Sequence, residues 1–588
     1  DGNSVVMNGH ALVYAGGYYS IAAAAGIVSR GDYATITMND DSRIAVDGPG
    51  VEGARGIRMS GYGSSVALND NAAILVAGDG SGNRNGGIVL NDDSHMSATL
   101  NDNAYIKTEN VAGIYARDVS DSTITLNGNS HIESVDAAGI NAHDVDNSTI
   151  EVGADSFVRG TRAIQLRGNF NNIIVAGTLY ATNNNAITLN GTNNTITLNS
   201  GVVIGGIRGA GNGTDHLVLQ GAGALGYDVS DIGTLDVDAS GIWNLLSTAT
   251  FGDVAINSGK LAVNGILNAN SITVNSGGTL GGNGYVYGEV TVEDGGILSP
   301  GNSPGTLNIV GNTTLTAGSI FDVEVEGLVA DLVNVDGDVT VDPGAILTPH
   351  FLGGVDGFVG DVLTVTGGHT ITGTFIIGNG GTVDYTDPSK VSLTAVSSSS
   401  MNGGLSAGSS TGFTFLDTVL GQAEKGIGRH HNLWASALWH HSDRTADGNS
   451  RGFSQKGMGG AFGGNVMEAG GMTLGLAGGY VDSDAVTTGG GTTTKIKGYH
   501  AAAYASYGMG ATTLTGAVTA AYQDQDISRN VLSGGVIVGA DSAPKAWLVG
   551  AGFGIGHAIP LEGGFTLTPK ASLGWQHMTR DSLTESGG

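Results

Sequence analysis

Arg30-Gly31-Asp32 is the first group of side chains in this 588-residue sequence that could do chemistry. It is an integrin-type tripeptide, so it predicts a cell-binding function for Arg30, Gly31 and Asp32. The same residue types also suit a sharp corner of the backbone. A cell-binding test of Asp32→Glu separates the two interpretations.

Two further groups have residues that bind metals elsewhere. Gly211 to Leu217 is similar to one calcium-binding nonapeptide, but that site shares each ion between adjacent turns and needs tandem copies, so a single copy favours a plain turn. His430-His431 and His440-His441 lie in alternating segments, where neighbouring side chains point to opposite faces and cannot chelate as a unit. We therefore expect no metal and no cofactor.

Pairs of acidic residues, such as Asp40-Asp41 and Asp92-Asp93, could line the cleft of an enzyme that cleaves acidic polysaccharides. Such a site combines carboxylates with Lys or Arg. Residues 1–400 hold 13 Lys+Arg against 40 Asp+Glu, a net charge of −27 that would repel a polyanion. We expect solvated corners rather than catalytic residues, and no serine-protease or lipase activity.

An internal repeat indicates how the backbone positions these residues. A Gly-Ile or Ala-Ile pair recurs in steps of 23 to 31 residues, and an alternating triplet follows each pair. The repeated isoleucines are Ile27, Ile57, Ile88, Ile114, Ile140, Ile164 and Ile187. Steps near 25 residues, with Gly, Asn and Asp at the corners, predict the coils of a right-handed parallel β-helix whose isoleucines stack.

A column of asparagines follows from the same repeat. Five of the seven triplets have an Asn three residues after their first position. These residues are Asn39, Asn69, Asn101, Asn127 and Asn199. Stacked coils would let each amide bond to the next, which makes a structural Asn ladder.

Residues 401–588 have a different composition, with 11 Lys+Arg and 13 Asp+Glu for a net charge of −2. Phe413, Leu416, Val419, Leu420 and Ala423 lie at helical spacing, which predicts a helix from about Thr414 to Lys425. About seven segments of some ten residues then alternate apolar with small or polar residues and carry aromatics at their ends. This pattern is typical of a transmembrane β-barrel rather than a soluble β-sandwich.

Motifs in both parts resemble autotransporters of the type V secretion pathway. Gly277 to Gly284 and Gly295 to Leu307, which include Ser299-Pro-Gly-Asn-Ser-Pro-Gly305, resemble the C-terminal segment of an autotransporter passenger. Four runs resemble the opening strands of the autotransporter β-domain: Asn432 to Trp434, Gly457 to Gly463, Leu474 to Tyr480 and Gly498 to Tyr504.

The resemblance implies a Gram-negative outer-membrane protein whose twelve-stranded barrel holds a linker helix and displays a passenger at the cell surface. Its partners would be outer-membrane lipid and the barrel-assembly machinery. The expected fold is all-β: a parallel β-helix, a short helix and a truncated antiparallel transmembrane barrel. We expect the chain to be an internal piece of a longer protein, divided as follows: 1–249, the passenger body; 250–400, autochaperone-like coils of the passenger; 401–429, a linker with the pore helix; 430–588, about seven of twelve barrel strands.

Two functions for the passenger remain at this point. The first is an adhesin, self-association or virulence factor that contacts host cells or neighbouring bacteria, and the second is a polysaccharide lyase or hydrolase built on a β-helix. The scarcity of basic residues favours the first. The net charge of −29 predicts no nucleic-acid partner.

Overall fold

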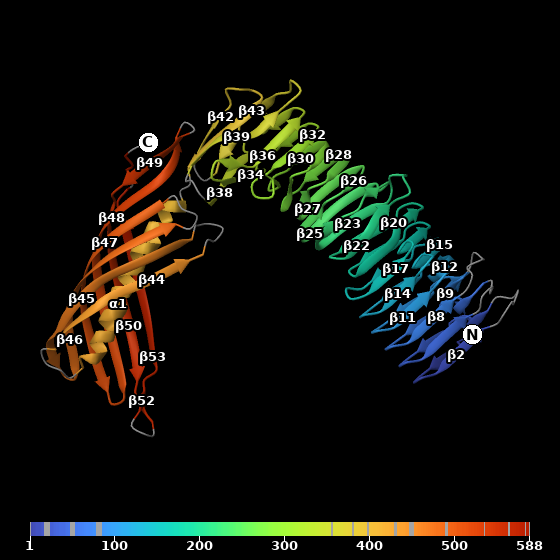
Figure 1. Cartoon of the computed structure of the whole chain (residues 1–588), viewed down its shortest axis with the longest axis horizontal. Helices are drawn as coiled ribbons and strands as arrows, with labels where there is room; N and C mark the ends of the chain where they lie inside the picture. Colours follow the sequence, from blue (N-terminus) through green and yellow to red (C-terminus); the bar gives the residue numbers. More distant parts are fainter. Residues whose placement is uncertain are drawn as a thin grey trace.

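The structure is a computed structural model, and it has two parts (Figure 1). A long rod of parallel strands comes first, and a helix wrapped by a curved antiparallel sheet follows it. The structure describes residues 2–16, 24–47, 53–77, 85–353, 357–378, 381–396, 399–427, 432–445, 452–487, 492–533, 536–561, 565–582 and 584–586.

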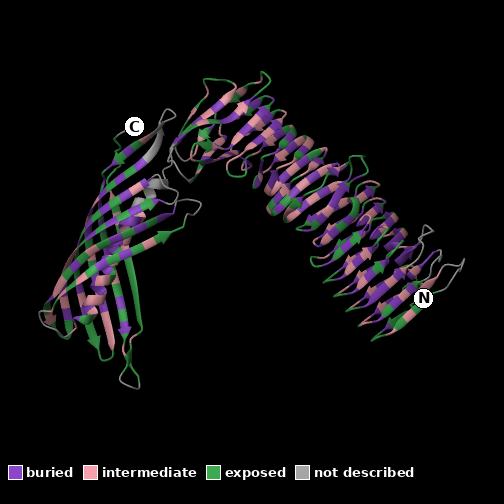
Figure 2. Ribbon diagram, in the orientation of Figure 1, coloured by how far each residue is buried: buried purple, intermediate pink, exposed green. Residues whose placement is uncertain are grey.

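The rod is a parallel β-helix, as predicted, and it has three faces. β1, β2 and β3 form one coil, and β4, β5 and β6 lie beside them in parallel register as the next coil. Long strands such as β20 and β25 bend round a corner and belong to two faces. The core therefore runs without a break along the axis of the rod, and Figure 2 shows buried segments recurring in coil after coil.

The strands of the first face are β1 (Ser4–Met7), β4 (Thr35–Met38), β7 (Ser65–Leu68), β10 (Ser97–Leu100), β13 (Thr123–Leu126), β16 (Thr149–Val152), β19 (Asn172–Val175), β21 (Thr195–Asn199), β23 (His216–Leu225), β25 (Thr234–Leu245), β27 (Asp253–Val263), β28 (Ile266–Val274), β30 (Tyr285–Val292), β33 (Thr313–Leu315), β37 (Val339–Val341) and β40 (Ile371–Gly373).

The strands that first appear on the second face are β2 (Leu12–Gly16), β5 (Arg43–Asp47), β8 (Ala73–Ala77), β11 (Tyr105–Thr108), β14 (His131–Ser134), β17 (Phe157–Gly160), β20 (Thr178–Asn190), β22 (Val202–Arg208), β29 (Gly278–Gly282), β31 (Ile297–Pro300), β34 (Ile320–Glu326), β38 (Ile346–Gly353) and β41 (Ile376–Ile377). Those of the third face are β3 (Ala25–Ser29), β6 (Arg55–Met59), β9 (Gly86–Asn91), β12 (Ala112–Ser120), β15 (Ile140–Asp146), β18 (Ile164–Arg167), β24 (Val229–Ser230), β26 (Thr248–Thr250), β32 (Thr306–Val310), β36 (Leu332–Asp336) and β39 (Gly357–Val365).

The repeated isoleucines stack on the inner side of the third face. Ile114 pairs with Ile88 of the preceding coil and with Ile140 of the next, and all three are fully buried. The stack extends from Ile27 to Ile187, through every position that the sequence repeat predicted. The prediction of stacked isoleucines is therefore confirmed.

Coil length changes along the rod. One inward column of the first face has sixteen members, and they are Met7, Met38, Leu68, Leu100, Leu126, Val152, Val175, Leu198, Leu219, Val237, Ile256, Val274, Val292, Leu315, Val341 and Gly373. Consecutive members are 30 or more residues apart at the start but only 18 or 19 apart from Leu219 to Val292. The coils shorten there because the strands turn the corners directly, with few turn residues between them.

The rod ends in antiparallel strands. β39 pairs with β43 (Lys390–Val396), and β42 (Thr382–Asp384) pairs with β43 on its other side. A short antiparallel hairpin of β34 with β35 (Val329–Ala330) projects just before this end. The sequence repeat predicted parallel coils to residue 400, so this change of direction was missed.

The helix α1 spans Ser399–Lys425 and is longer than predicted. The predicted start near Thr414 is wrong because the Gly- and Ser-rich residues before it were expected to break the helix. In the structure this half of α1 is enclosed by the antiparallel sheet, whose strands contact α1 along its length. Within the described residues, no helix is both long and apolar enough to cross a membrane.

The antiparallel sheet runs in the order β44-β45-β46-β47-β48-β50-β53, with β49 paired to the far end of β48. Most of its strands are longer than the ten residues predicted, because the hairpins extend past the helix. The bounds are β44 (Leu433–Arg444), β45 (Phe453–Ala469), β46 (Met472–Thr487), β47 (Thr492–Met509), β48 (Thr512–Ser533), β49 (Val536–Ser542), β50 (Lys545–His557) and β53 (Lys570–Arg580). A separate two-stranded sheet of β51 (Ile559–Pro560) and β52 (Thr566–Leu567) lies between β50 and β53 in the chain.

The outer face of this sheet carries exposed apolar side chains. An aromatic row crosses four neighbouring strands through Tyr480, Tyr499, Tyr522 and Trp547, which pair directly from strand to strand. Adjacent rings lie 5.3 Å apart for Tyr480 and Tyr499 and 5.1 Å apart for Tyr522 and Trp547. Exposed apolar residues with a row of aromatics are typical of a membrane-facing barrel wall.

Candidate functional site: the enclosed helix and the corners of the rod

The inner face of the antiparallel sheet holds α1 through apolar contacts. Phe415, Leu416, Val419, Leu420 and Ala423 are buried in one cluster with side chains of the wall. The wall residues are Leu438, Ala461, Val481, Ala502, Tyr504 and Ala517. The sequence reasoning placed Phe413 on this face, but Phe413 is 38% exposed and Phe415 is the buried ring.

Glycines of the wall make room for the helix. A Cβ on Gly479 would lie 2.6 Å from the Phe415 ring, and one on Gly552 would lie 3.0 to 3.1 Å from Leu420 and Leu416. The absence of a side chain at Gly479 and Gly552 is therefore required by the enclosed helix. The sequence showed that small residues alternate with apolar ones in these strands but not what these two glycines accommodate.

Two glutamines of the wall bind the backbone of α1. Gln523 donates from Nε2 to the carbonyl of Gly408 at 2.9 Å and to Oγ1 of Thr411 at 2.8 Å. Gln455 donates from Nε2 to the carbonyl of Ala407 at 3.0 Å. Both glutamines are buried, so each bond also satisfies a polar group that has lost water.

A relay of side chains fixes the other end of the helix. The indole of Trp434 donates to the hydroxyl of Tyr504 at 3.0 Å, and that hydroxyl donates to Oδ1 of Asn465 at 3.0 Å. Asn465 donates from Nδ2 to the carbonyl of Gly426, just past the last turn, at 2.9 Å. Buried networks of this kind are rigid when every member is bonded.

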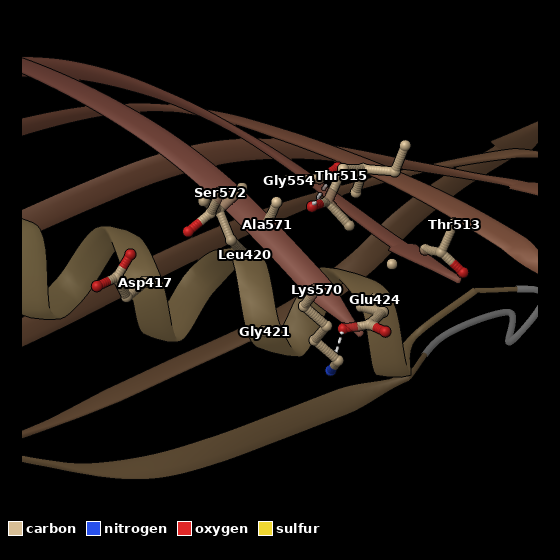
Figure 3. A pocket seen from close by; sticks show the side chains of 12 residues that line it. Asp417, Leu420, Gly421, Glu424, Thr513, Thr515, Gly554, Lys570, Ala571 and Ser572 are labelled. Carbon is tan, nitrogen blue, oxygen red and sulfur yellow. Dashed lines mark hydrogen bonds and ion pairs between the residues drawn. The ribbon is translucent and has the colours of Figure 1, made fainter. Parts of the chain in front are cut away.

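A polar cavity of about 230 Å³ lies between α1 and strands β48, β50 and β53 (Figure 3). Asp417 and Glu424 face it from the helix, and Thr513, Thr515 and Ser572 face it from the wall. Lys570 reaches across from β53 and binds Glu424 at 2.6 Å. Hydroxyls and carboxylates thus line the cavity, with no pairing of nucleophile and base among these residues.

The predicted Asn column forms hydrogen bonds along the rod. Asn39 donates from Nδ2 to Oδ1 of Asn8 at 2.7 Å, and Asn69, Asn101 and Asn127 each donate to the preceding member at 2.8, 2.8 and 2.9 Å. Asn199 lies opposite Gln220 in the strand register. Gly153 and Ala176 occupy the two positions of the column between Asn127 and Asn199. The amides thus bond in the first coils and stop where the column loses its asparagines.

Aspartates beside the Asn column turn the corner. Asp40, Asp70 and Asp102 have φ of 56°, 56° and 57°, a left-handed conformation that Asp tolerates better than most residues. Asp40 accepts the N–H of Gly9 at 2.8 Å, and Asp70 accepts the N–H of Asp40 at 3.0 Å. Asp40 and Asp41, suggested above as a cleft, are therefore corner residues that bind adjacent coils.

A second, buried ladder lies at another corner. Ser122, Ser148, Asn171, Asn194 and Asp215 are all buried, and each accepts a backbone N–H from the coil before it. Sequence reasoning missed this ladder because Ser, Asn and Asp replace one another in it. Asp215 ends it and also accepts the N–H of Ala210, so in the Gly211 to Leu217 run its carboxylate is bound to protein.

The Arg30-Gly31-Asp32 corner is exposed at Arg30 and Asp32. Oδ1 of Asp32 accepts the N–H of Tyr62 at 3.0 Å, and the carbonyl of Gly31 accepts the hydroxyl of Ser64 at 3.0 Å. The tripeptide is thus bound to the next coil while the guanidinium of Arg30 extends outward, and its cell-binding role stays a prediction.

The paired histidines occupy different places. His430 and His431 lie outside the described residues. His440 is buried on the inner face and His441 is exposed, where it lies 2.9 Å from Asp443. The described ranges hold no group of three or more side chains that would suit a metal ion.

The expectation of no serine-protease or lipase activity rested on the absence of the Gly-x-Ser-x-Gly pattern of a serine nucleophile, and that reading of the sequence was wrong, because the pattern occurs at Gly301 to Gly305. Ser303 has φ of 69°, and its hydroxyl donates to Glu324 at 2.5 Å rather than to a histidine. His350 lies on the neighbouring strand and bonds to Asp322 at 2.9 Å, which raises the pKa of His350. These contacts do not form a serine–histidine pair.

Asp331 fixes the same region of the rod. Its carboxylate is buried and accepts the N–H groups of Gly305 at 2.7 Å and Glu324 at 2.9 Å. Burial raises the pKa of Asp331 to about 6, even though the two hydrogen bonds favour the ionised form. The carboxyl therefore takes up a proton at mildly acidic pH.

The comparisons with known proteins agree with this geometry. The family model of the autotransporter β-domain matches residues 433–588, the range of the antiparallel sheet. A search of curated proteins found no match. Residues 433–588 therefore belong to the autotransporter β-domain family, which places this domain in the outer membrane of a Gram-negative cell and the β-helical passenger that precedes it at the cell surface.

Proposed function

We propose that the passenger is an adhesive or self-associating surface module and not an enzyme. The observation that carries this proposal is the repetition within the rod: the core is continuous, and in the first coils the same Asn side chain recurs at the same corner from Asn39 to Asn127. A surface of this kind repeats each contact along its length, so several weak contacts add by multivalency.

The distribution of charge supports the same proposal over a polysaccharide-cleaving enzyme. Many cations of the rod are bound to acids of the same face: Arg117 lies 3.1 Å from Asp118, and Arg208 lies 3.2 Å from Asp231. Lys107 and Arg159 both bind Glu133, at 3.5 and 2.9 Å. Cations held in this way are poorly placed to bind an acidic polysaccharide.

In this function the contacts between α1 and the wall of the β-domain anchor the rod. Gln523, Gln455 and Asn465 hold the helix inside the β-domain, and the helix leads directly into the rod. The rod is thus anchored at one end, with its corners presented to the surroundings.

Expression of the full chain on a non-adherent Gram-negative host tests this function. Cells are scored for clumping and for attachment to host cells, against cells that carry residues 399–588 alone. The proposal expects clumping or attachment only with the rod. Equal scores for both strains, or cleavage of a polysaccharide by the displayed rod, would refute it.

A further inference from the structure

An exposed pair of tyrosines stands on the third face of the rod. Tyr285 is 48% exposed and Tyr287 is 40% exposed, although both belong to a regular strand of a continuous β-helix. Their ring centroids lie 6.4 Å apart, with only 21° between the ring planes. Two large exposed rings with nearly parallel planes are a feature of a binding surface.

The strands on either side extend this pair into a strip. Strand pairing places two outward columns side by side over β26, β28, β30, β32, β36 and β39, about 24 Å at ~4.8 Å per strand. We call these residues the tyrosine strip: Thr248, Ile266, Tyr285, Asn308, Asn334 and Thr364 in one column, and Thr250, Asn268, Tyr287, Val310 and Asp336 in the other.

The tyrosine strip differs from the rest of the rod in charge. Its single charged member, Asp336, lies near one end, whereas residues 1–400 carry a net charge of −27. A cationic partner would bind more strongly to the acidic residues outside the strip, and an anionic partner would be repelled by the negative charge of the surrounding rod. The strip therefore fits an uncharged partner.

The polar side chains of the strip are already fixed in position. Asn334 donates from Nδ2 to Oδ1 of Asn308 at 3.2 Å and accepts the hydroxyl of Thr364 at 2.6 Å. Asn268 donates to the hydroxyl of Thr250 at 3.3 Å. An amide has two N–H groups and two acceptor sites, so each of these asparagines keeps unused capacity toward solvent while its orientation is set by its neighbours.

We propose that the tyrosine strip binds a neutral oligosaccharide along the axis of the rod. A pyranose ring has an apolar face of C–H groups and an edge of hydroxyls. The faces of two successive sugars would stack on Tyr285 and Tyr287, and their hydroxyls would bond to Asn268, Asn308 and Asn334. Hydroxyl and amide side chains outnumber the aliphatic ones in the strip and surround the two rings, which favours a glycan over a protein partner.

This inference rests on the proposed adhesive function, because it names the class of molecule that the rod contacts. The test uses the full chain displayed on cells and three fluorescent neutral hexasaccharides: cellohexaose, chitohexaose and maltohexaose. A heparin hexasaccharide serves as the acidic comparison. Binding is measured by flow cytometry at low and high salt.

We expect at least one neutral hexasaccharide to bind equally at both salt concentrations. Tyr285→Ala with Tyr287→Ala should weaken binding about tenfold or more, because two aromatic contacts are lost. The pair Tyr285→Phe with Tyr287→Phe keeps the rings and should retain binding. Tyr227→Ala is the matched control, since Tyr227 is also 48% exposed but lies outside the strip.

Three results would overturn the proposal: no neutral hexasaccharide binds, the double alanine variant binds as well as the parent, or only the heparin fragment binds. Protease resistance of the displayed rod shows that each variant is folded. The clumping and attachment assay separates the two proposals. Cells that adhere without using the strip refute this site alone, and cells that bind sugar without adhering refute the adhesive function alone.

Discussion

Replacement of Ile114 by alanine tests the stacked core of the passenger most directly. Ile114 is fully buried between Ile88 of the preceding coil and Ile140 of the next. The change removes three carbons, which is about 2.4 kcal/mol at about 0.8 kcal/mol for each. The cavity that remains between three coils adds to this, so we expect a loss of about 3–4 kcal/mol. Ile114→Val removes one carbon and should lose about 1 kcal/mol.

The position of the loss is as informative as its size. In a solenoid each coil contacts only its neighbours, so the effect should stay local. Amide hydrogen exchange on the full chain should become roughly 200- to 900-fold faster in β9, β12 and β15, since each 1.36 kcal/mol is a factor of ten. Exchange around Leu280, many coils away, should not change.

Two results would contradict this reasoning. An equal effect of Ile114→Ala and Ile114→Val would show that the isoleucines do not fill a close-packed column. A uniform acceleration along the whole rod would show that the passenger unfolds as one unit rather than coil by coil.

Three further predictions concern the Asn column, Asp331 and the pore. Asn101→Ala removes hydrogen bonds of 2.8 and 2.9 Å to Asn69 and Asn127 and should lower local stability by about 1 kcal/mol. Asn103→Ala, whose two bonds are both 3.3 Å long, should lose less, and equal losses in denaturant melts would refute the ladder. The folded state holds the Asp331 proton up to about pH 6, whereas the unfolded chain releases it near pH 4. The contribution of Asp331 to the free energy of unfolding should therefore fall by about 3 kcal/mol as pH rises through this window. Urea unfolding should show this slope in the stability difference between wild type and Asp331→Asn. Gly479→Val should displace the Phe415 ring and make the outer membrane permeable to vancomycin, while Gly516→Val, where a Cβ meets nothing closer than 3.8 Å, should not; equal sensitivity would show that the helix does not close the pore.

Much of the passenger could be predicted because its signal is repeated. Each Ile of the stack occurs with the same neighbours every coil, so seven weak local signals support one another. Where the residue type changes along a column, as from Ser148 to Asn171 to Asp215, the sequence no longer shows the ladder, although the hydrogen bonds continue.

The start of the helix was predicted less well because contacts with the surrounding strands, and not local sequence, determine where it begins. The Gly- and Ser-rich half of α1 is a poor helix by propensity, yet wall side chains such as Gln523 and Gln455 bond to its backbone. The choice between Phe413 and Phe415 likewise depends on the space left by Gly479 on a strand far along the chain. Neither long-range contact leaves a periodic pattern in the sequence.

The narrow coils from Leu219 to Val292 have a mechanical consequence for the displayed passenger. The resistance of a beam to bending rises steeply with its girth, and these coils have the least chain in each cross-section. Drag on the wider distal coils would therefore bend the rod mainly in this narrow segment. Tyr285 and Tyr287 lie within it, so fluid shear on the cell would flex the passenger at the very segment that carries the exposed rings.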